Sequence, residues 1–161
     1  MRPWLKAGLI GGGILGLLTV LGGLGTVLPS GTRNIIGCCI CIPFLLAYPG
    51  IGALAAYWLT PPRTAGDGAK EGALAGMIAG AINGVVSVLL TLILSATGAY
   101  ERVLYQLPPD AMRALEETGL KGLYTTSGML GSSCLGGICG ILWAVAMGAA
   151  GGAIFAAIQR E

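Results

Sequence analysis

The sequence predicts an all-α integral membrane protein with four transmembrane helices. Only 10% of its 161 residues are charged, against about 25% in soluble domains. The mean hydropathy is +0.82, and the few charges fall between long apolar runs. The net charge of +2 is too small to indicate a nucleic-acid partner. The composition therefore predicts a lipid bilayer as the surroundings of this chain.

Four apolar segments are each long enough to cross a bilayer, which requires about 20 helical residues. The predicted spans cover residues 5–28, 35–59, 72–99 and 128–158, within a single transmembrane domain, 1–161. The linker at 29–34 is short, so the first two spans form a helical hairpin, and the last two form a second one. An even number of spans places both termini on one side of the membrane.

The third linker is the longest, and it contains a candidate surface helix near 110–118. Pro108-Pro109-Asp110 is typical of a helix start, with Asp110 as the N-cap, and Gly119 is typical of a helix end. We expect this short helix to lie at the membrane interface. An ordinary solvated helical turn is the alternative.

The basic residues favour cytoplasmic termini by a small margin. On the side of the termini they are Arg2, Lys6, Arg63, Lys70 and Arg160. On the opposite side they are Arg33, Arg102, Arg113 and Lys121. Because the side richer in Lys and Arg usually faces the cytoplasm, five against four predicts that the termini lie there.

Glycines at four-residue spacing form stripes on three of the predicted spans. The stripes comprise Gly8, Gly12 and Gly16 in the first span, Gly72, Gly76, Gly80 and Gly84 in the third, and Gly136, Gly140, Gly148 and Gly152 in the fourth. Residues at i and i+4 share one helix face, and small residues there let helix backbones approach closely in lipid. The stripes predict helix packing within the chain. Contact with partner subunits or with another copy, and a glycine-lined pore, are the alternatives.

The first and third spans begin alike, which predicts an internal repeat. Lys6–Gly16 aligns with Lys70–Gly80 without gaps, matching the lysine, three glycines and one isoleucine. Both copies start on the same side of the membrane, so the repeat would be parallel. Chance similarity between glycine-rich segments is the alternative.

A ridge of small polar residues continues the glycine stripe of the third span. It consists of Asn83, Ser87, Thr91 and Ser95. Such side chains hydrogen-bond between helices or to their own backbone. Apart from Lys6 at the start of the first span, the four predicted spans contain no Asp, Glu, Lys, Arg or His, the groups that usually mark coupled ion pathways. We therefore predict no catalytic residues, no enzyme activity and no cofactor.

The five cysteines fall in the same half of the predicted bilayer. They are Cys38, Cys39 and Cys41 in the second span and Cys134 and Cys139 in the fourth. Simple apolar packing is the first interpretation. A disulfide joining Cys38 or Cys39 to Cys134 is a second, and lipidation near the interface a third. A thiolate metal site is a fourth, but the spacing matches no standard ligand motif, so no metal is predicted.

Two prolines, Pro43 and Pro49, lie inside the second predicted span. Each removes a backbone hydrogen bond and bends a helix. A kink is the first expectation, and local unwinding around residues 47–50 is the alternative.

One part of the sequence resembles a group of known proteins. The segments Gly37-Cys-Cys-Ile-Cys41, Gly50–Tyr57 and Gly66–Gly76 resemble small, uncharacterised, glycine-rich, four-helix membrane proteins of bacteria and archaea. The similarity covers residues 35–95 and rests on a glycine-rich span, a Gly-Asp-Gly-Ala linker and a second glycine-rich span. It implies a prokaryotic multi-pass protein and carries over no activity or site residue.

Together these features predict a non-enzymatic subunit. We expect a structural or accessory protein of the prokaryotic inner membrane that packs through its glycine faces against itself or other membrane-protein subunits. An oligomeric channel or small-molecule transporter is the alternative, and a thiol redox or metal-binding membrane protein is the second alternative.

Overall fold

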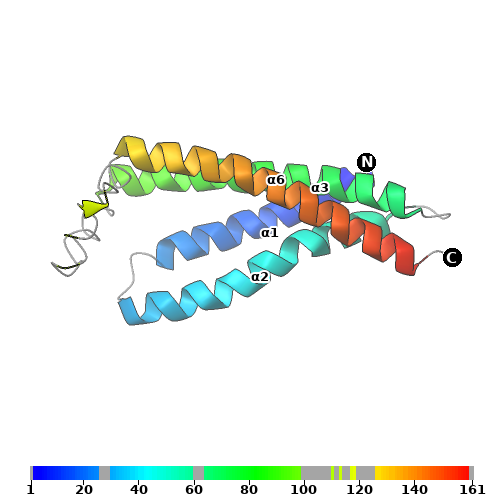
Figure 1. Ribbon diagram of the computed structural model, residues 1–161, viewed down its shortest axis with the longest axis horizontal. Helices are drawn as coiled ribbons and strands as arrows, with labels where there is room; N and C mark the ends of the chain where they lie inside the picture. Colours follow the sequence, from blue (N-terminus) through cyan, green and yellow to red (C-terminus); the bar gives the residue numbers. More distant parts are fainter. Residues whose placement is uncertain are drawn as a thin grey trace.

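Four long helices make up the part of the chain that the structure describes. This computed structural model describes residues 2–25, 30–59, 64–98 and 126–159, with positions 110, 113, 117 and 118 between them; side chains are described except at 24, 25, 30–42, 126, 127, 129 and 130. The helices are α1 (Pro3–Gly25), α2 (Ser30–Tyr57), α3 (Ala65–Ala96) and α6 (Thr126–Ile158) (Figure 1). The predicted all-α class is confirmed. The predicted surface helix near 110–118 lies outside the described residues, apart from the isolated positions above.

Three of these helices are long and apolar enough to cross a membrane. The apolar stretches cover Pro3–Gly23, Ala65–Ala96 and Gly131–Ile158, and the described part of α2 adds a shorter one, Pro43–Tyr57. Large apolar side chains lie exposed along the outside of all four helices. An aqueous solvent would make these faces costly, whereas lipid accommodates them. The chain thus has the form of a membrane protein, with the fourth span still a prediction.

The start of α3 corrects the predicted third span. The helix begins at Ala65, seven residues before the expected Gly72, within the segment expected to be a linker. Thr64 is the N-cap: its hydroxyl oxygen accepts a hydrogen bond from the Asp67 backbone N–H at 3.1 Å, and its proton goes to Asp67 Oδ2 at 2.6 Å. This arrangement gives a hydrogen-bond acceptor to a backbone N–H group of the first helical turn, which has no partner within the helix. Charges at 67–71 therefore mark the end of the apolar stretch, and the helix continues beyond it.

The other helix bounds differ from the predicted ones by smaller margins. Residues 30–34, expected to belong to a linker, form the first turns of α2. This helix continues through Pro43 and Pro49, so the alternative of an unwound segment is wrong. At its other end α3 stops at Ala96, and Gly98 follows with φ of +65°. That left-handed conformation, which glycine adopts without strain, closes the helix.

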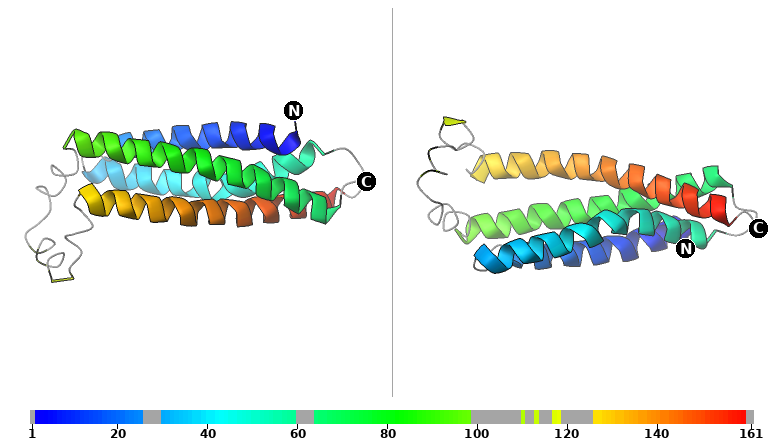
Figure 2. Two further views of the ribbon diagram at one scale, coloured as in Figure 1. Left: turned by 90° about the horizontal axis from the view of Figure 1, so that it is seen from above. Right: turned by 60° about the horizontal axis from the view of Figure 1, so that its bottom comes forward.

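Successive helices alternate in direction, and the start of α1 and the end of α6 lie at the same end of the bundle (Figure 1). α3 is central to the arrangement, because it packs against α1, α2 and α6. Its contact with α6 is the most extensive, and α1 contacts α3 more extensively than it contacts α2. The helices converge toward the end that carries the termini and spread toward the other end (Figures 1 and 2).

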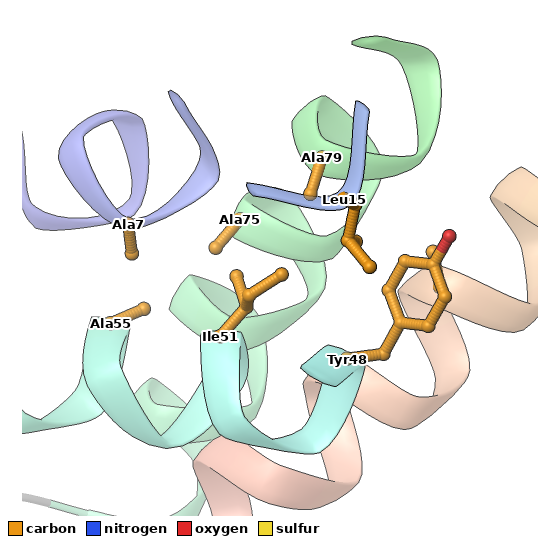
Figure 3. Packing of buried hydrophobic residues seen from close by; sticks show 8 residues of the cluster. Ala7, Leu15, Tyr48, Ile51, Ala55, Ala75 and Ala79 are labelled. Atoms are coloured by element: carbon orange, nitrogen blue, oxygen red, sulfur yellow. The ribbon is translucent and has the colours of Figure 1, made fainter. Parts of the chain in front are cut away.

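The core at the converging end is built mainly from alanine. The buried cluster comprises Ala7, Leu15, Tyr48, Ile51, Ala55, Ala75, Ala79 and Ala144. Leu15 is the largest side chain that is fully buried. Figure 3 shows Ile51 and Tyr48 of α2 extending toward α1 and α3, where the alanines leave room. Side chains this small cannot separate helix axes, so the helices pack at short distances.

Glycines bring the backbones of α3 and α6 into direct contact. A Cβ atom built at Gly72 would overlap the carbonyl oxygen of Gly148, and one built at Gly148 would overlap that of Gly72. At Gly76 the added atom would lie 2.9 Å from the Ala144 carbonyl carbon. Real Cβ atoms essentially never show such separations. Only glycine therefore permits this approach, which is the geometry expected of small-residue stripes in membranes.

Close backbone contacts of the same kind occur at a further glycine pair of α3 and α6 and between α2 and α6. Gly68 meets Gly152 on α6, while Gly52 of α2 meets the carbonyl of Gly148, and Gly151 meets that of Pro49. Three helix backbones therefore touch at one level of the bundle. Gly52, Gly68 and Gly151 are packing residues that the predicted stripes did not include.

The α1 stripe packs against a different kind of surface. Cβ atoms built at Gly8 and Gly12 would lie 2.9 Å from Ile78 Cβ and 2.8 Å from Ile82 Cδ1. One built at Gly16 would lie 3.3 Å from Val86 Cγ2. Glycines of α1 thus receive a row of branched side chains from α3. A hydrogen bond from the Trp4 backbone N–H to Glu71 Oε2, at 3.3 Å, joins the same two helices near their starts.

Replacing Gly148 by alanine tests the backbone contact. We expect a loss of about 1–3 kcal/mol in the free energy of unfolding, because the new methyl group meets rigid backbone atoms of α3. The measurement is reversible unfolding in mixed micelles. Gly13→Ala is the matched control, since no heavy atom lies within 4 Å of a Cβ built there; it should be neutral or stabilising by up to about 1 kcal/mol. Equal stabilities for the two variants would contradict the contact.

Candidate functional site

The bundle has a second half in which glycines no longer bring the backbones of α3 and α6 into contact. Gly80 still lies against α6, where a built Cβ would be 3.0 Å from Ala144 Cβ. One helical turn further, at Gly84, no heavy atom lies within 4 Å of the built position, and the same is true of Gly136 and Gly140 on α6. These three members of the predicted stripes do not pack within the described residues. The reason is tertiary, because the two helix axes diverge beyond Gly80.

The divergence opens a small polar cleft between α2, α3 and α6. Its volume is about 140 Å³. The residues around it are glycines and hydrogen-bonding side chains: Tyr48, Gly80, Asn83, Gly84, Ser87, Ser133, Gly136, Gly137 and Gly140. Two members of the predicted polar ridge, Asn83 and Ser87, thus line the same cleft. We take this cleft as the candidate functional site.

Asn83 connects α1 and α3 beside the cleft. The Thr19 hydroxyl of α1 donates to Asn83 Oδ1 at 2.5 Å and to the Leu15 carbonyl of its own helix at 2.9 Å. A hydroxyl has one proton, so these two acceptors share it. The side chain of Tyr48 from α2 lines the same cleft as Asn83. The hydrogen bond from Thr19 orients the amide, as a partly buried polar group requires.

A second connection crosses from α3 to α6. The Thr91 hydroxyl, which is buried, donates to the Ser87 carbonyl at 2.9 Å. The Ser133 hydroxyl lies 3.2 Å from the Thr91 oxygen. Either hydroxyl can be the donor of this interhelical hydrogen bond. It joins the diverging helices across the space that the glycines leave.

The ridge residues therefore have different roles. Asn83 and Thr91 form interhelical bonds. The Ser87 hydroxyl has no hydrogen-bond partner within the described residues, and its side chain lines the cleft. The Ser95 hydroxyl is buried, and it also lacks a partner in the part of the chain that the structure describes. Of the four, Ser87 is the residue left free to bind something in the cleft.

Tyr48 is a site residue that the sequence did not reveal as one. It lies next to Pro49, in the segment interpreted as a kink. The structure buries its ring, with only 4% of the side chain exposed, and stacks Phe44 edge-on against it at 5.9 Å between ring centroids. The signal in the sequence was a tyrosine in an apolar, proline-containing segment, four residues after Phe44.

An apolar groove lies on the other side of the same divergence. Its volume is about 490 Å³, and it opens between α3 and α6. The lining residues are Ala81, Gly84, Val85, Val88, Leu89, Ser133, Cys134, Gly137, Ile138 and Ile141. Gly84, Ser133 and Gly137 also line the polar cleft, so they form a shared wall between the two spaces.

The two described cysteine side chains do not form a cluster. Cys134 and Cys139 are free and exposed on α6, and Cys134 lines the outer groove. The side chains of Cys38, Cys39 and Cys41 lie outside the described residues, so the predicted thiol cluster remains a prediction. Among the described residues, no group of three or more His, Cys, Asp or Glu side chains could hold a metal ion.

The chemistry of the cleft is that of neutral hydrogen bonding. Its lining side chains offer one amide and three hydroxyls, and none of them is a carboxylate, an amine or an imidazole. Such groups recognise polar molecules by donating and accepting hydrogen bonds. They supply neither the counter-charge that a buried ion requires nor an acid–base pair for catalysis.

Comparisons with known proteins add no relative to this description. No family model, no curated protein and no solved structure matches the chain. The account of the site therefore rests on its own geometry.

A double-mutant cycle on Thr19 and Asn83 tests the connection beside the cleft. Thr19→Val, Asn83→Ala and their combination should show a coupling energy of about 0.6 kcal/mol, and at most about 1.7, because polar partners in membranes are only partly lost on unfolding. The measurement is unfolding in mixed micelles. Ser87→Ala is the control and should not change stability, since its hydroxyl has no partner among the described residues. Zero coupling would show that the two side chains are not bonded.

Proposed function

We propose that this chain is a non-enzymatic, multi-pass membrane protein that acts as a structural or accessory subunit, assembled with further copies of itself. Its four helices would span the bilayer as two hairpins. The observation that carries the proposal is the apolar groove between α3 and α6. Glycine contacts hold these helices together at one end, so the gap at the other end cannot close within the chain.

The structure changes which surface the assembly would use. Eight glycines of the predicted stripes are occupied inside the chain: Gly8, Gly12, Gly16, Gly72, Gly76, Gly80, Gly148 and Gly152. They are therefore not free to bind a partner. What stays open is the groove of about 490 Å³, a volume that bulky side chains of another helix fill more completely than mobile lipid tails.

A stripe of exposed apolar side chains on α1 supplies bulky groups of the kind that the groove lacks. It consists of Ile10, Ile14, Leu17 and Leu21, each about half exposed or more. The spacing of four, three and four residues is that of side chains that insert into a neighbouring helix surface. We propose that this stripe of one copy packs into the groove of the next. The stripe and the groove are different surfaces, so repeated contacts of this kind form a ring when the rotation between neighbouring copies closes.

The inner polar cleft favours the second candidate, an oligomeric channel or small-molecule transporter. Within one chain the cleft ends at the level where Gly52, Gly72 and Gly148 bring three backbones together. This contact closes the path through a single bundle. A conducting route would therefore run between copies, and the same ring would be required for it.

The location of the protein belongs to the proposal as well. The resemblance to glycine-rich prokaryotic membrane proteins favours the plasma membrane of a bacterium or archaeon. The basic residues favour cytoplasmic termini. The start of α1 and the end of α6 at one end of the bundle (Figure 1) agree with termini on a shared side.

Cysteine cross-linking tests the proposed contact between copies. The parent variant replaces Cys38, Cys39, Cys41 and Cys139 by alanine and keeps Cys134 in the groove. Adding Leu17→Cys should give an oligomer ladder on oxidation in membranes. Leu17 is eight residues from the end of α1, and Cys134 is eight residues from the start of α6. Both should therefore lie about 12 Å from the spreading end.

Ile10→Cys in the same parent is the matched control. It lies on the same stripe but about 10 Å further along α1, so it should cross-link much less. A strictly monomeric mass in mild detergent together with no Leu17→Cys ladder would overturn the assembly. A single cross-linked product whose mass is not a multiple of the mass of this chain would identify a different subunit as the partner.

A further inference from the structure

The polar cleft has properties that helix packing does not explain. In a helix interior, glycine costs up to about 1 kcal/mol relative to alanine. At Gly72 and Gly148 the backbone contact explains the choice of glycine. At Gly84, Gly136, Gly137 and Gly140 no heavy atom lies within 4 Å of a built Cβ. What these four glycines share is the cleft that they line, so their effect is to keep that space empty of side chains.

The polar groups of the cleft point to a bound molecule. Tyr48 is buried, yet it contributes to the cleft lining, and the hydrogen bond from Thr19 orients the Asn83 amide that lines the same cleft. The Ser87 hydroxyl beside them has no partner within the described residues. A free hydroxyl next to an oriented amide forms a ready donor and acceptor pair.

Size and charge limit the class of ligand. A volume of about 140 Å³ corresponds to about four or five water molecules, and it is close to cavities of about 150 Å³ that accept a benzene-sized molecule. No lining side chain carries a full charge, and a buried ion without a counter-charge is costly. We infer that the cleft binds a small uncharged molecule, of about four to six non-hydrogen atoms, that both donates and accepts hydrogen bonds. This site is independent of the proposed assembly, because its polar groups face into the bundle.

Nuclear magnetic resonance of the full chain in lipid nanodiscs tests the inference. The Asn83 side-chain amide is followed while urea or glycerol is added as the probe, with guanidinium and acetate as charged counterparts. We expect a saturable shift of the Asn83 signal with at least one uncharged probe and none with the charged ones. Ser87→Ala should weaken the binding roughly 3- to 10-fold, the effect of one hydrogen bond.

A filling variant separates binding from folding. Gly140→Val places a side chain in the cleft wall, where the built Cβ meets no atom within 4 Å, and it should abolish the saturable shift. Gly13→Val, equally free of neighbours but outside the cleft, should bind like the natural chain. The inference is overturned if neither uncharged probe gives a saturable shift, if a charged probe binds as well, or if Gly140→Val leaves binding unchanged.

Discussion

The direct contact between the backbones of α3 and α6 determines the rest of this structure. Gly72 and Gly148 each occupy a position where a methyl group would overlap the carbonyl of the other. The hydrophobic effect contributes little to helix association in lipid. Close van der Waals packing therefore has to supply the free energy of association. The alanine core around this contact follows from it, because larger side chains would hold the helices apart. The contact with α2 through Gly52 depends on the same short distance.

The contact also explains why the other half of the bundle is open. Two long helices that touch at one end and cross at an angle must separate further along. Here the separation begins beyond Gly80 and leaves a polar cleft on one side and an apolar groove on the other. A hydrogen bond between Thr91 and Ser133 bridges the widening space. One half of the bundle is therefore tightly packed, and the other half contains both the polar cleft and the apolar groove.

The sequence was informative where the bilayer acts on single helices and less so where helices meet. Apolar length predicted α1, α3 and α6, and four-residue spacing predicted that Gly72 and Gly76 pack closely. Gly68 was assigned to a linker, since Asp67 and Lys70 end the apolar pattern although the helix continues past them. Gly136 and Gly140 have the same spacing as Gly148 and Gly152, yet only the second pair meets α3. Spacing identifies a helix face, whereas the crossing of two axes decides which part of that face is covered.

The candidate site shows the same limit. Asn83 and Ser87 were recognisable as polar residues in an apolar span, but their meeting with Tyr48 depends on how α2 is rotated against α3. That rotation depends on Ile51, which packs over Gly11, and on Gly52, which meets Gly148. These contacts between separate helices follow no periodic spacing along the sequence.

Solid-state nuclear magnetic resonance in lipid bilayers gives the most direct test of the central contact. With carbon labels at Gly72 and Gly148, the account predicts strong through-space cross-peaks between the carbonyl of one residue and the Cα of the other. The same labels at Gly84 and Gly140 should give none, since no atom surrounds the built positions there. Absence of the Gly72–Gly148 cross-peaks, or equal intensity for both pairs, would contradict a bundle held together at one end and open at the other.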